Sequence, residues 1–542
     1  MSDDFDVVVA GAGHNSLVAA SYLTKAGLRC LVLEARPEIG GDTSNEEMPL
    51  PGFWQDSCST AHSLFHASPI YQEDELHLAE LGLEYVFPDP VAHISFPDGT
   101  WFTQWRDLER TCDELGKFSK RDADAYRKLL DDFGEVAGLL RAHRYTPIGF
   151  GPSLTERLAA RPDGATWRRR LASSSWEIIS DTFEDWHNQT YMLWMATQTV
   201  QPADRPGSGE LAYSLVAGRQ RHSWAVPKGG SGRLAHALAR VVEQGGGAIR
   251  CDARVSELLL DRGRCCGVRT ADGSEHRARL AVLSSVHIKH LVDMAPASSW
   301  GEEFRDGVET WRAGVSLFAS YYAVTEPPAY PVDGGVLTPL ASGTASSPER
   351  ELRLSRDFRL GEVDLEDPTL LVLCPTVSDP SRAPEGRHTL KIVGMCPYDL
   401  PGGPERWDDI KEEVADAHLR QLRRFAPNLT DDKVLGRVVR SPLDLERFNS
   451  HNWHGSCHGG DLSPAQSQDM RPVPGWASHR MPIAGLYQTG GTTHPGGSVS
   501  GGPGRNAAAV MLKDLLGLGL EQVVAGGTAS VASGRGSGSG GR

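Results

Sequence analysis

A glycine-rich turn between a short apolar strand and a helix constrains the fold of this chain more than any other feature. Residues 6–10 read DVVVA, an apolar run typical of a buried strand, and the turn GAGHNS follows at 11–16. An apolar helical pattern comes next, and a second apolar run, 30–33, ends on Glu34. This order predicts a βαβ unit of the Rossmann type, which binds a dinucleotide at the N-terminus of its helix.

Each residue type in this turn has a physical role in holding a dinucleotide. Gly11 permits the tight turn, and Gly13 lets backbone N–H groups approach a pyrophosphate. Ser16 stands where a third glycine is usual, and it is small enough for close packing of helix on strand. Glu34 can accept hydrogen bonds from the adenosine ribose hydroxyls. The predicted contacts in this unit are Gly11, Gly13, His14, Asn15, Ser16, Glu34, Ala35 and Arg36.

Two further glycine-rich segments favour FAD over a nicotinamide cofactor. The stretch EARPEIGG at 34–41 ends in two residues without a Cβ, so the chain can pass close to phosphates and a ribityl chain; an ordinary loop is the alternative. At 485–509 a short strand, 486–489, leads through a glycine-rich loop to a helix that begins near Gly504. Amides at its N-terminus could stabilise negative charge on a reduced flavin. The predicted contacts here are Gly40, Gly41, Asp42, Thr43, Gly490, Gly491, Gly497, Ser498 and Val499.

Together with VPKGGSGRLAHALA at 226–239, these motifs resemble a known group of enzymes. The chain is similar to the phytoene desaturase, carotenoid ketolase and retinol saturase group of FAD-dependent oxidoreductases, in the branch whose first loop reads G-H-N-x-L-V. The match reaches about Leu516, and THPGG…GxPGxNAA is its most specific part. The resemblance implies FAD, a glutathione-reductase-type fold and a backbone contact from Val255 to the adenine. Amine oxidases are distantly similar to this group.

The order of segments predicts an α/β fold with a discontinuous FAD-binding Rossmann-like domain formed by 1–75, 222–300 and 478–520. Residues 76–221 and 301–477 should form a mixed α+β substrate or cap domain. Its helical patterns cover 107–115, 123–140 and 176–200, and its strand patterns cover 315–324, 370–374 and 389–394. The Gly/Ser-rich tail at 521–542 is predicted to be disordered.

Composition and charge restrict the binding partners and the cell compartment that we expect for this protein. The formal net charge of −15 disfavours nucleic acids and anionic membrane surfaces. No run of eighteen apolar residues is present, no signal peptide precedes the first strand, and the nine cysteines show no C-x-x-C spacing. We expect a cytoplasmic protein with reduced thiols and no integral membrane association. The oligomeric state stays open, with a homodimer as one alternative.

Three histidines are candidates for catalysis: His494, His454 and His62. His494 lies in the THPGG loop, where it either contacts the flavin, as hydrogen-bond partner or general base, or fixes the loop by bonding a backbone carbonyl. His62 lies in the loop 51–69, where the resembled family carries an Asp, a His and a Ser-Pro.

His454 belongs to the histidine-rich stretch 449–461, whose spacing fits no closed zinc pattern. The resembled family has an Asn…Gly-Gly-Asp motif there and no metal. We therefore predict a loop that closes over the flavin and contacts the substrate through His454, Asn452 and Asp461, with no metal site.

These observations predict an FAD-dependent dehydrogenase, desaturase or oxidase. A small organic substrate would give hydride from a C–H bond to flavin N5. No second nucleotide fingerprint is present, so oxygen or a quinone should accept the electrons. One alternative is an amine or amino-acid oxidase, which would need an aromatic cage or a carboxylate-binding arginine in the cap. Another is a redox-neutral isomerase or a protein that binds FAD for structure alone.

Overall fold

The computed structural model describes residues 5–527, and a largely parallel sheet forms the centre of its first layer. Five of its strands pair in parallel, in the order β9, β2, β1, β12 and β20. They come from three distant stretches of sequence: β1 Phe5–Ala10, β2 Cys30–Leu33, β9 Ala248–Arg250, β12 Glu275–Ser284 and β20 Leu486–Gln488. Two antiparallel strands, β10 Val255–Asp261 and β11 Arg264–Thr270, extend from β12. The predicted α/β Rossmann-like class is confirmed.

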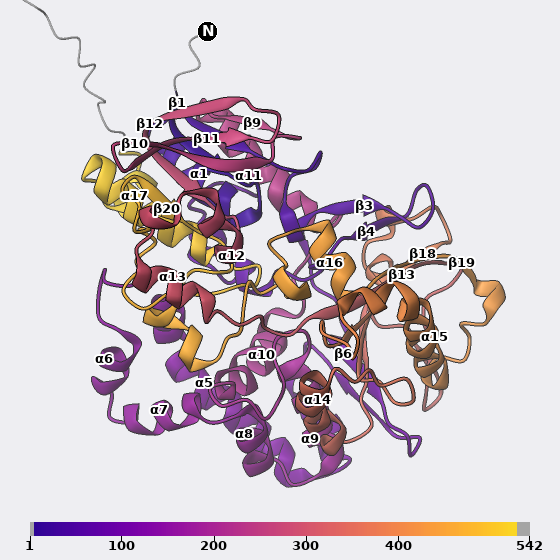
Figure 1. Ribbon diagram of the computed structural model, residues 1–542. Helices are drawn as coiled ribbons and strands as arrows, with labels where there is room; N and C mark the ends of the chain where they lie inside the picture. Colours follow the sequence, from indigo (N-terminus) through magenta and orange to yellow (C-terminus); the bar gives the residue numbers. More distant parts are fainter. Residues whose placement is uncertain (1–4, 528–542) are drawn as a thin grey trace, which may run out of the picture.

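Three helices cover this sheet and bring its N-terminal and C-terminal segments together (Figure 1). They are α1 His14–Lys25, α11 Gly232–Gln244 and α17 Gly502–Leu516. A Cβ on Gly504 of α17 would collide with the backbone carbonyl of Asn15 in α1, so glycine sets the approach of the two helices. The N-terminal turn and the C-terminal helix therefore share one core.

The expected disordered tail is only partly described, and its first residues are ordered. Helix α18, Leu520–Val524, buries Leu520 and Val523 against the core that α1 and α17 form. The prediction of disorder from residue 521 is wrong for 521–524, because two apolar side chains one turn apart suffice to dock a short helix. Residues 528–542 lie outside the described part of the chain.

A second sheet joins the two cap segments. Its strand order is β19-β13-β18-β17-β16-β6-β7, and a parallel pairing of β6 with β16 connects the first cap segment to the second. Their bounds are β6 Ala92–Ser95, β7 Trp101–Gln104, β13 Leu317–Val324, β16 Ala341–Thr344, β17 Leu370–Leu373, β18 His388–Met395 and β19 Val434–Arg440. The smaller strands are β3 Asn45–Glu47, β4 Trp54–Asp56, β5 Tyr85–Val86, β8 Val226–Pro227, β14 Tyr330–Val332 and β15 Gly335–Leu337.

Helices of the cap lie below the first layer in Figure 1, and α15 lies beside the second sheet. They are α4 Leu108–Gly116, α5 Lys120–Arg144, α6 Leu154–Ala159, α7 Gly164–Ala172, α8 Ser175–Thr182, α9 Trp186–Thr197, α10 Gly209–His222, α14 Pro348–Leu360 and α15 Trp407–Phe425. Short helices elsewhere are α2 Ser63–His66, α3 Pro69–Gln72, α12 Ile288–Leu291, α13 Glu302–Glu309 and α16 Pro442–Phe448. None of the helices in 5–527 combines the length and apolar composition that crossing a bilayer requires.

The helical pattern at 176–200 is divided into α8 and α9 instead of forming one helix. The buried carboxylate of Asp122 accepts the backbone N–H groups of Glu184 and Asp185, at 2.8 and 3.1 Å. Asp185 then caps α9 by accepting the N–H of His187 at 2.9 Å. A tertiary contact therefore ends one helix and starts the next, and hydrophobic periodicity does not report such a contact.

Candidate functional site

In the first glycine turn, Gly11 has no room for a side chain, whereas Gly13 has free space beside it. Gly11 has φ +98° and donates its N–H to the carbonyl of Leu33 at 2.7 Å, and a Cβ on it would collide with the side chain of Ser285. Gly13 has ordinary extended backbone angles, and a Cβ built on it meets no atom within 4 Å among the described residues. The free space beside Gly13 is where the sequence predicts a pyrophosphate.

The three residues after Gly13 carry buried polar atoms without partners. His14 Nε2, Asn15 Oδ1 and Ser16 Oγ are buried, and none has a hydrogen-bond partner among the described residues. These three residues form the first turn of α1, where backbone N–H groups are also free of helical partners. Buried polar groups without partners are rare in proteins, and a helix N-terminus favours an anion. The turn therefore fits a phosphate-bearing cofactor.

Glu34 holds the adjoining loop and keeps acceptor capacity. Its Oε2 accepts the N–H of Ala12 at 2.7 Å, and its Oε1 accepts the N–H of Arg36 at 3.0 Å. Each carboxylate oxygen has a second lone pair, so hydroxyl groups of a ribose can bind as well. The N–H of Ala253 donates to the carbonyl of Glu34 at 2.7 Å, which brings the segment before Val255 beside this acid.

Asp42 links the first unit to the histidine-rich loop. Its Oδ1 accepts the side-chain amides of Asn449 at 2.9 Å and Asn452 at 3.0 Å. The predicted substrate residue Asn452 is thus fully buried and holds Asp42 in place. Asp461, the other predicted substrate residue, donates its N–H to the carbonyl of Arg312 at 3.0 Å, and its side chain lies outside the central cavity.

The C-terminal glycine loop lies directly against the same histidine-rich loop. A Cβ on Gly497 would collide with the backbone of His458, and a Cβ on Gly490 would lie 3.3 Å from the ring of His451. His451 donates from Nδ1 to the carbonyl of Ser285 at 3.0 Å, directly after β12. The first turn, β12 and the C-terminal loop are therefore assembled around one place, as the sequence predicts.

A cavity of about 820 Å³ extends from this place into the cap. Four of the predicted cofactor residues line it: His14, Asp42, Ser498 and Val499. Its cap side is largely apolar and includes Leu130, Phe133, Trp194, Met195, Leu371 and Val393. The cofactor segments and the cap thus line one common cavity.

The three predicted catalytic histidines lie outside the lining of this cavity. His494 donates from Nε2 to the carbonyl of His143 at 3.2 Å, and His62 Nε2 lies 2.7 Å from Ser231 Oγ. Burial lowers the pKa of both imidazoles to about 3. The contact of His494 favours the loop-fixing interpretation over the flavin-contacting one.

The third histidine, His454, points to a different part of the surface. Its ring stacks on Tyr398 with the centroids 4.5 Å apart, and its side chain is 35% exposed. Its positive φ of 53° turns the backbone away from the neighbouring histidines. A pattern of closely spaced histidines does not report such a reversal, so the sequence could not separate His454 from its neighbours.

The cavity residues that were missed as site candidates include His458 and Lys391. His458 donates from Nε2 to the carbonyl of Thr199 at 2.7 Å, so Nδ1 carries a lone pair, and Nδ1 has no partner among the described residues. Burial lowers the pKa of His458 and of Lys391. Lys391 donates to the carbonyls of Asp56, at 3.3 Å, and Cys58. His458 was visible in the histidine-rich stretch, but no local pattern marks Lys391 on β18.

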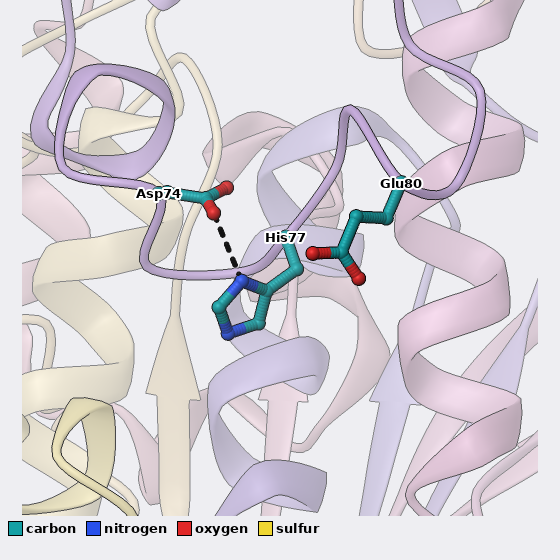
Figure 2. Close-up of side chains that lie close together, drawn as sticks. All are labelled: Asp74, His77 and Glu80. Carbon is teal, nitrogen blue, oxygen red and sulfur yellow. Dashed lines mark hydrogen bonds and ion pairs between the residues drawn. The ribbon is translucent and has the colours of Figure 1, made fainter.

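One group of ligand-type side chains lies on the surface. Figure 2 shows the carboxylates of Asp74 and Glu80 beside the ring of His77, with a 2.9 Å contact between Asp74 and His77. Their ligand atoms lie within 4.8 Å of one another, and all three residues are exposed. They are outside the cavity lining, and exposed acidic groups of this kind are common without a metal ion.

Comparisons with known proteins agree with this geometry. The family model "Flavin containing amine oxidoreductase" matches residues 17–512. The chain is 28% identical to the rat "Pyridine nucleotide-disulfide oxidoreductase domain-containing protein 2", covering 95% of this chain and 94% of the relative. It is 26% identical to a lycopene-forming phytoene desaturase of Pseudescherichia vulneris, covering 94% and 99%. In fold it is similar to putrescine oxidase solved with putrescine, with a TM-score of 0.60, 14% identity and coverage of 95% and 99%. The chain therefore belongs to the flavin-containing amine oxidoreductase family.

Proposed function

We propose that this protein is an FAD-dependent dehydrogenase or oxidase that introduces unsaturation into a small or medium organic substrate. The observation that carries the proposal is the cavity itself, because residues of the glycine turn and of the C-terminal loop line one end and apolar cap residues line the other. The similarity to a phytoene desaturase supports a desaturating reaction. A substrate C–H bond held in the cap would face the cofactor end of this space.

FAD, when bound, supplies a hydride acceptor at its N5. The protein would bind and orient the cofactor and the substrate, and it would exclude water from the site. The N-terminus of α1 and Glu34 would hold the pyrophosphate and ribose, and backbone N–H groups at the N-terminus of α17 would stabilise negative charge on the reduced cofactor. The apolar lining removes water from the reacting carbon.

One cavity imidazole can take the proton that leaves with the hydride. Burial lowers the pKa of His458, which favours its neutral form. Its Nδ1 carries a lone pair and has no partner among the described residues. We assign the proton to this nitrogen. Oxygen or a quinone would then reoxidise the flavin.

The redox proposal is tested by anaerobic mixing of the reconstituted protein with candidate substrates. We expect the flavin absorption to bleach in step with formation of an unsaturated product. Bleaching that yields an imine from an amine would assign the amine-oxidase alternative instead. Product formation with the flavin oxidised throughout turnover would overturn the proposal in favour of a redox-neutral isomerase.

The cofactor placement is tested by Gly13→Val. The backbone angles of Gly13 suit valine and the space beside its Cβ is open, so the variant should fold like the wild type. The new side chain would occupy the predicted pyrophosphate position, and FAD retention should fall by about a hundredfold or more. Gly116→Val, at another open position in α4, is the matched control. Unchanged FAD content in a folded Gly13→Val protein would contradict the placement.

A further inference from the structure

An arginine in the cap lines the same cavity and has an unusual set of partners. Arg219 lies in the last turn of α10. Its Nη1 donates to the hydroxyl of Ser63 and, at 3.4 Å, to the carbonyl of Ser223. Its guanidinium lies over the ring of Trp224, 3.8 Å from the centroid. All of these partners are neutral, so none of them balances the positive charge.

Three other cations of the cavity lining have acidic neighbours, and the two remaining ones, Arg106 and Arg221, are exposed to solvent. Arg141 pairs with Glu73 at 2.8 Å and Arg144 pairs with Glu210 at 2.9 Å. Lys391 lies in the electrostatic field of Asp56. Within residues 5–527, by contrast, no carboxylate forms an ion pair with Arg219. Burial lowers its pKa to about 10, so it still carries a full charge at neutral pH.

The unused donors of Arg219 are the ones that a ligand can reach. Both of its hydrogen bonds within the described residues start from Nη1, which leaves Nε and Nη2 without acceptors. The side chain is partly accessible and contributes to the cavity wall. Nε and one Nη form the fork of a guanidinium that binds a carboxylate through two parallel hydrogen bonds. A half-buried charge without a counter-ion is costly, and a bound anion would reduce that cost.

The rest of the cavity indicates what such an anion is attached to. The apolar part of the cavity wall includes Leu130 and Phe133 of α5 and Trp194 and Met195 of α9. Val499 lies at the cofactor end of the same space. The lining therefore suits an apolar body with one charged end.

We propose that Arg219 is a substrate-binding residue that pairs with a carboxylate of the substrate, whose apolar remainder lies along the cavity toward the cofactor end. The inference rests on the proposed function, because it names the substrate class of that same site. It also supplies the carboxylate-binding arginine that an amino-acid oxidase would need, without requiring an amine on the substrate.

The test uses FAD-loaded protein and straight-chain carboxylates from butanoate to dodecanoate, with the matching primary alcohols as neutral probes. Binding is measured by titration calorimetry and by the shift in melting temperature. We expect at least one acid to bind about tenfold or more tightly than its alcohol. Arg219→Gln should remove that preference and leave alcohol binding unchanged, and Arg219→Lys should restore part of it. Arg168→Gln, at an exposed arginine of α7, should bind acids like the wild type.

Two results would overturn the inference: acids that bind no better than alcohols, or an Arg219→Gln protein that keeps the preference for acids. FAD content is measured in every sample. A wild type that retains FAD but shows no preference for acids removes the inference and leaves the proposed function standing. A wild type that takes up no FAD removes the proposed function first. If Arg219→Gln does not fold, the acid–alcohol comparison in the wild type and the Arg219→Lys variant still decide the matter.

Discussion

At the scale of single residues, the buried carboxyl group of Glu351 in α14 has a raised pKa, although it lies outside the cavity lining. Its Oε2 accepts from the hydroxyl of Thr197 at 3.5 Å, and its Oε1 has no partner among the described residues. Burial raises the pKa of this carboxyl to about 7. The folded protein therefore binds this proton more tightly than the unfolded chain does.

Glu351 should make the stability of the protein depend on pH. Its contribution is fully present below the unfolded-state pKa and is lost as the pH rises through about 7. Glu351→Gln should flatten the free energy of unfolding across this range, with a gain of about 3 kcal/mol at pH 8. Urea denaturation at several pH values measures this, and Glu349→Gln, exposed on the same helix, is the control. Parallel pH curves for wild type and Glu351→Gln would show that the carboxyl titrates normally.

At the scale of elements, the packing of α17 against α1 leaves no room for a side chain at Gly504. Gly504→Ala would place a methyl group against the carbonyl of Asn15 and 2.9 Å from Cβ of Val18. Moving the two helices apart should cost about 2–3 kcal/mol of stability. It should also weaken FAD binding, because the N-terminus of α1 moves. Urea denaturation and FAD titration test both effects, with Lys513→Ala on the exposed side of α17 as control. A variant equal to the wild type in both measurements would contradict the close approach.

The same scale shows what the sequence could predict. Gly11 contacts Leu33 and Glu34 contacts Ala12 within one continuous βαβ unit, so their pattern was readable, and the fold class that followed from it is confirmed. Lys391 and Arg219 enter the cavity through the arrangement of the second sheet and the cap helices, which no local pattern encodes. The division between α8 and α9 likewise depends on Asp122, some sixty residues earlier in the chain.

Across the whole molecule, Asp42 joins segments about four hundred residues apart. Asp42→Ala would leave the amides of Asn449 and Asn452 without their shared acceptor, at a cost of about 2–3 kcal/mol. We expect faster hydrogen exchange in 449–460 and weaker substrate binding, whereas Asp42→Asn, which keeps an acceptor oxygen, should lie nearer the wild type. Exchange measured by mass spectrometry decides this. Equal protection of 449–460 in Asp42→Ala would show that the loop is held by other contacts.

The placement of β20 and α17 has a consequence for how the protein is made. Both elements belong to the first layer, yet they are translated after the entire cap. A nascent chain that lacks them has no partner for residues 282–284 of β12 and no helix at the face of α1 that α17 covers. The βαβ unit of β1, α1 and β2 must therefore wait for β20 and α17 before its pocket is complete. Cofactor capture should thus follow the synthesis of the entire cap and of α17.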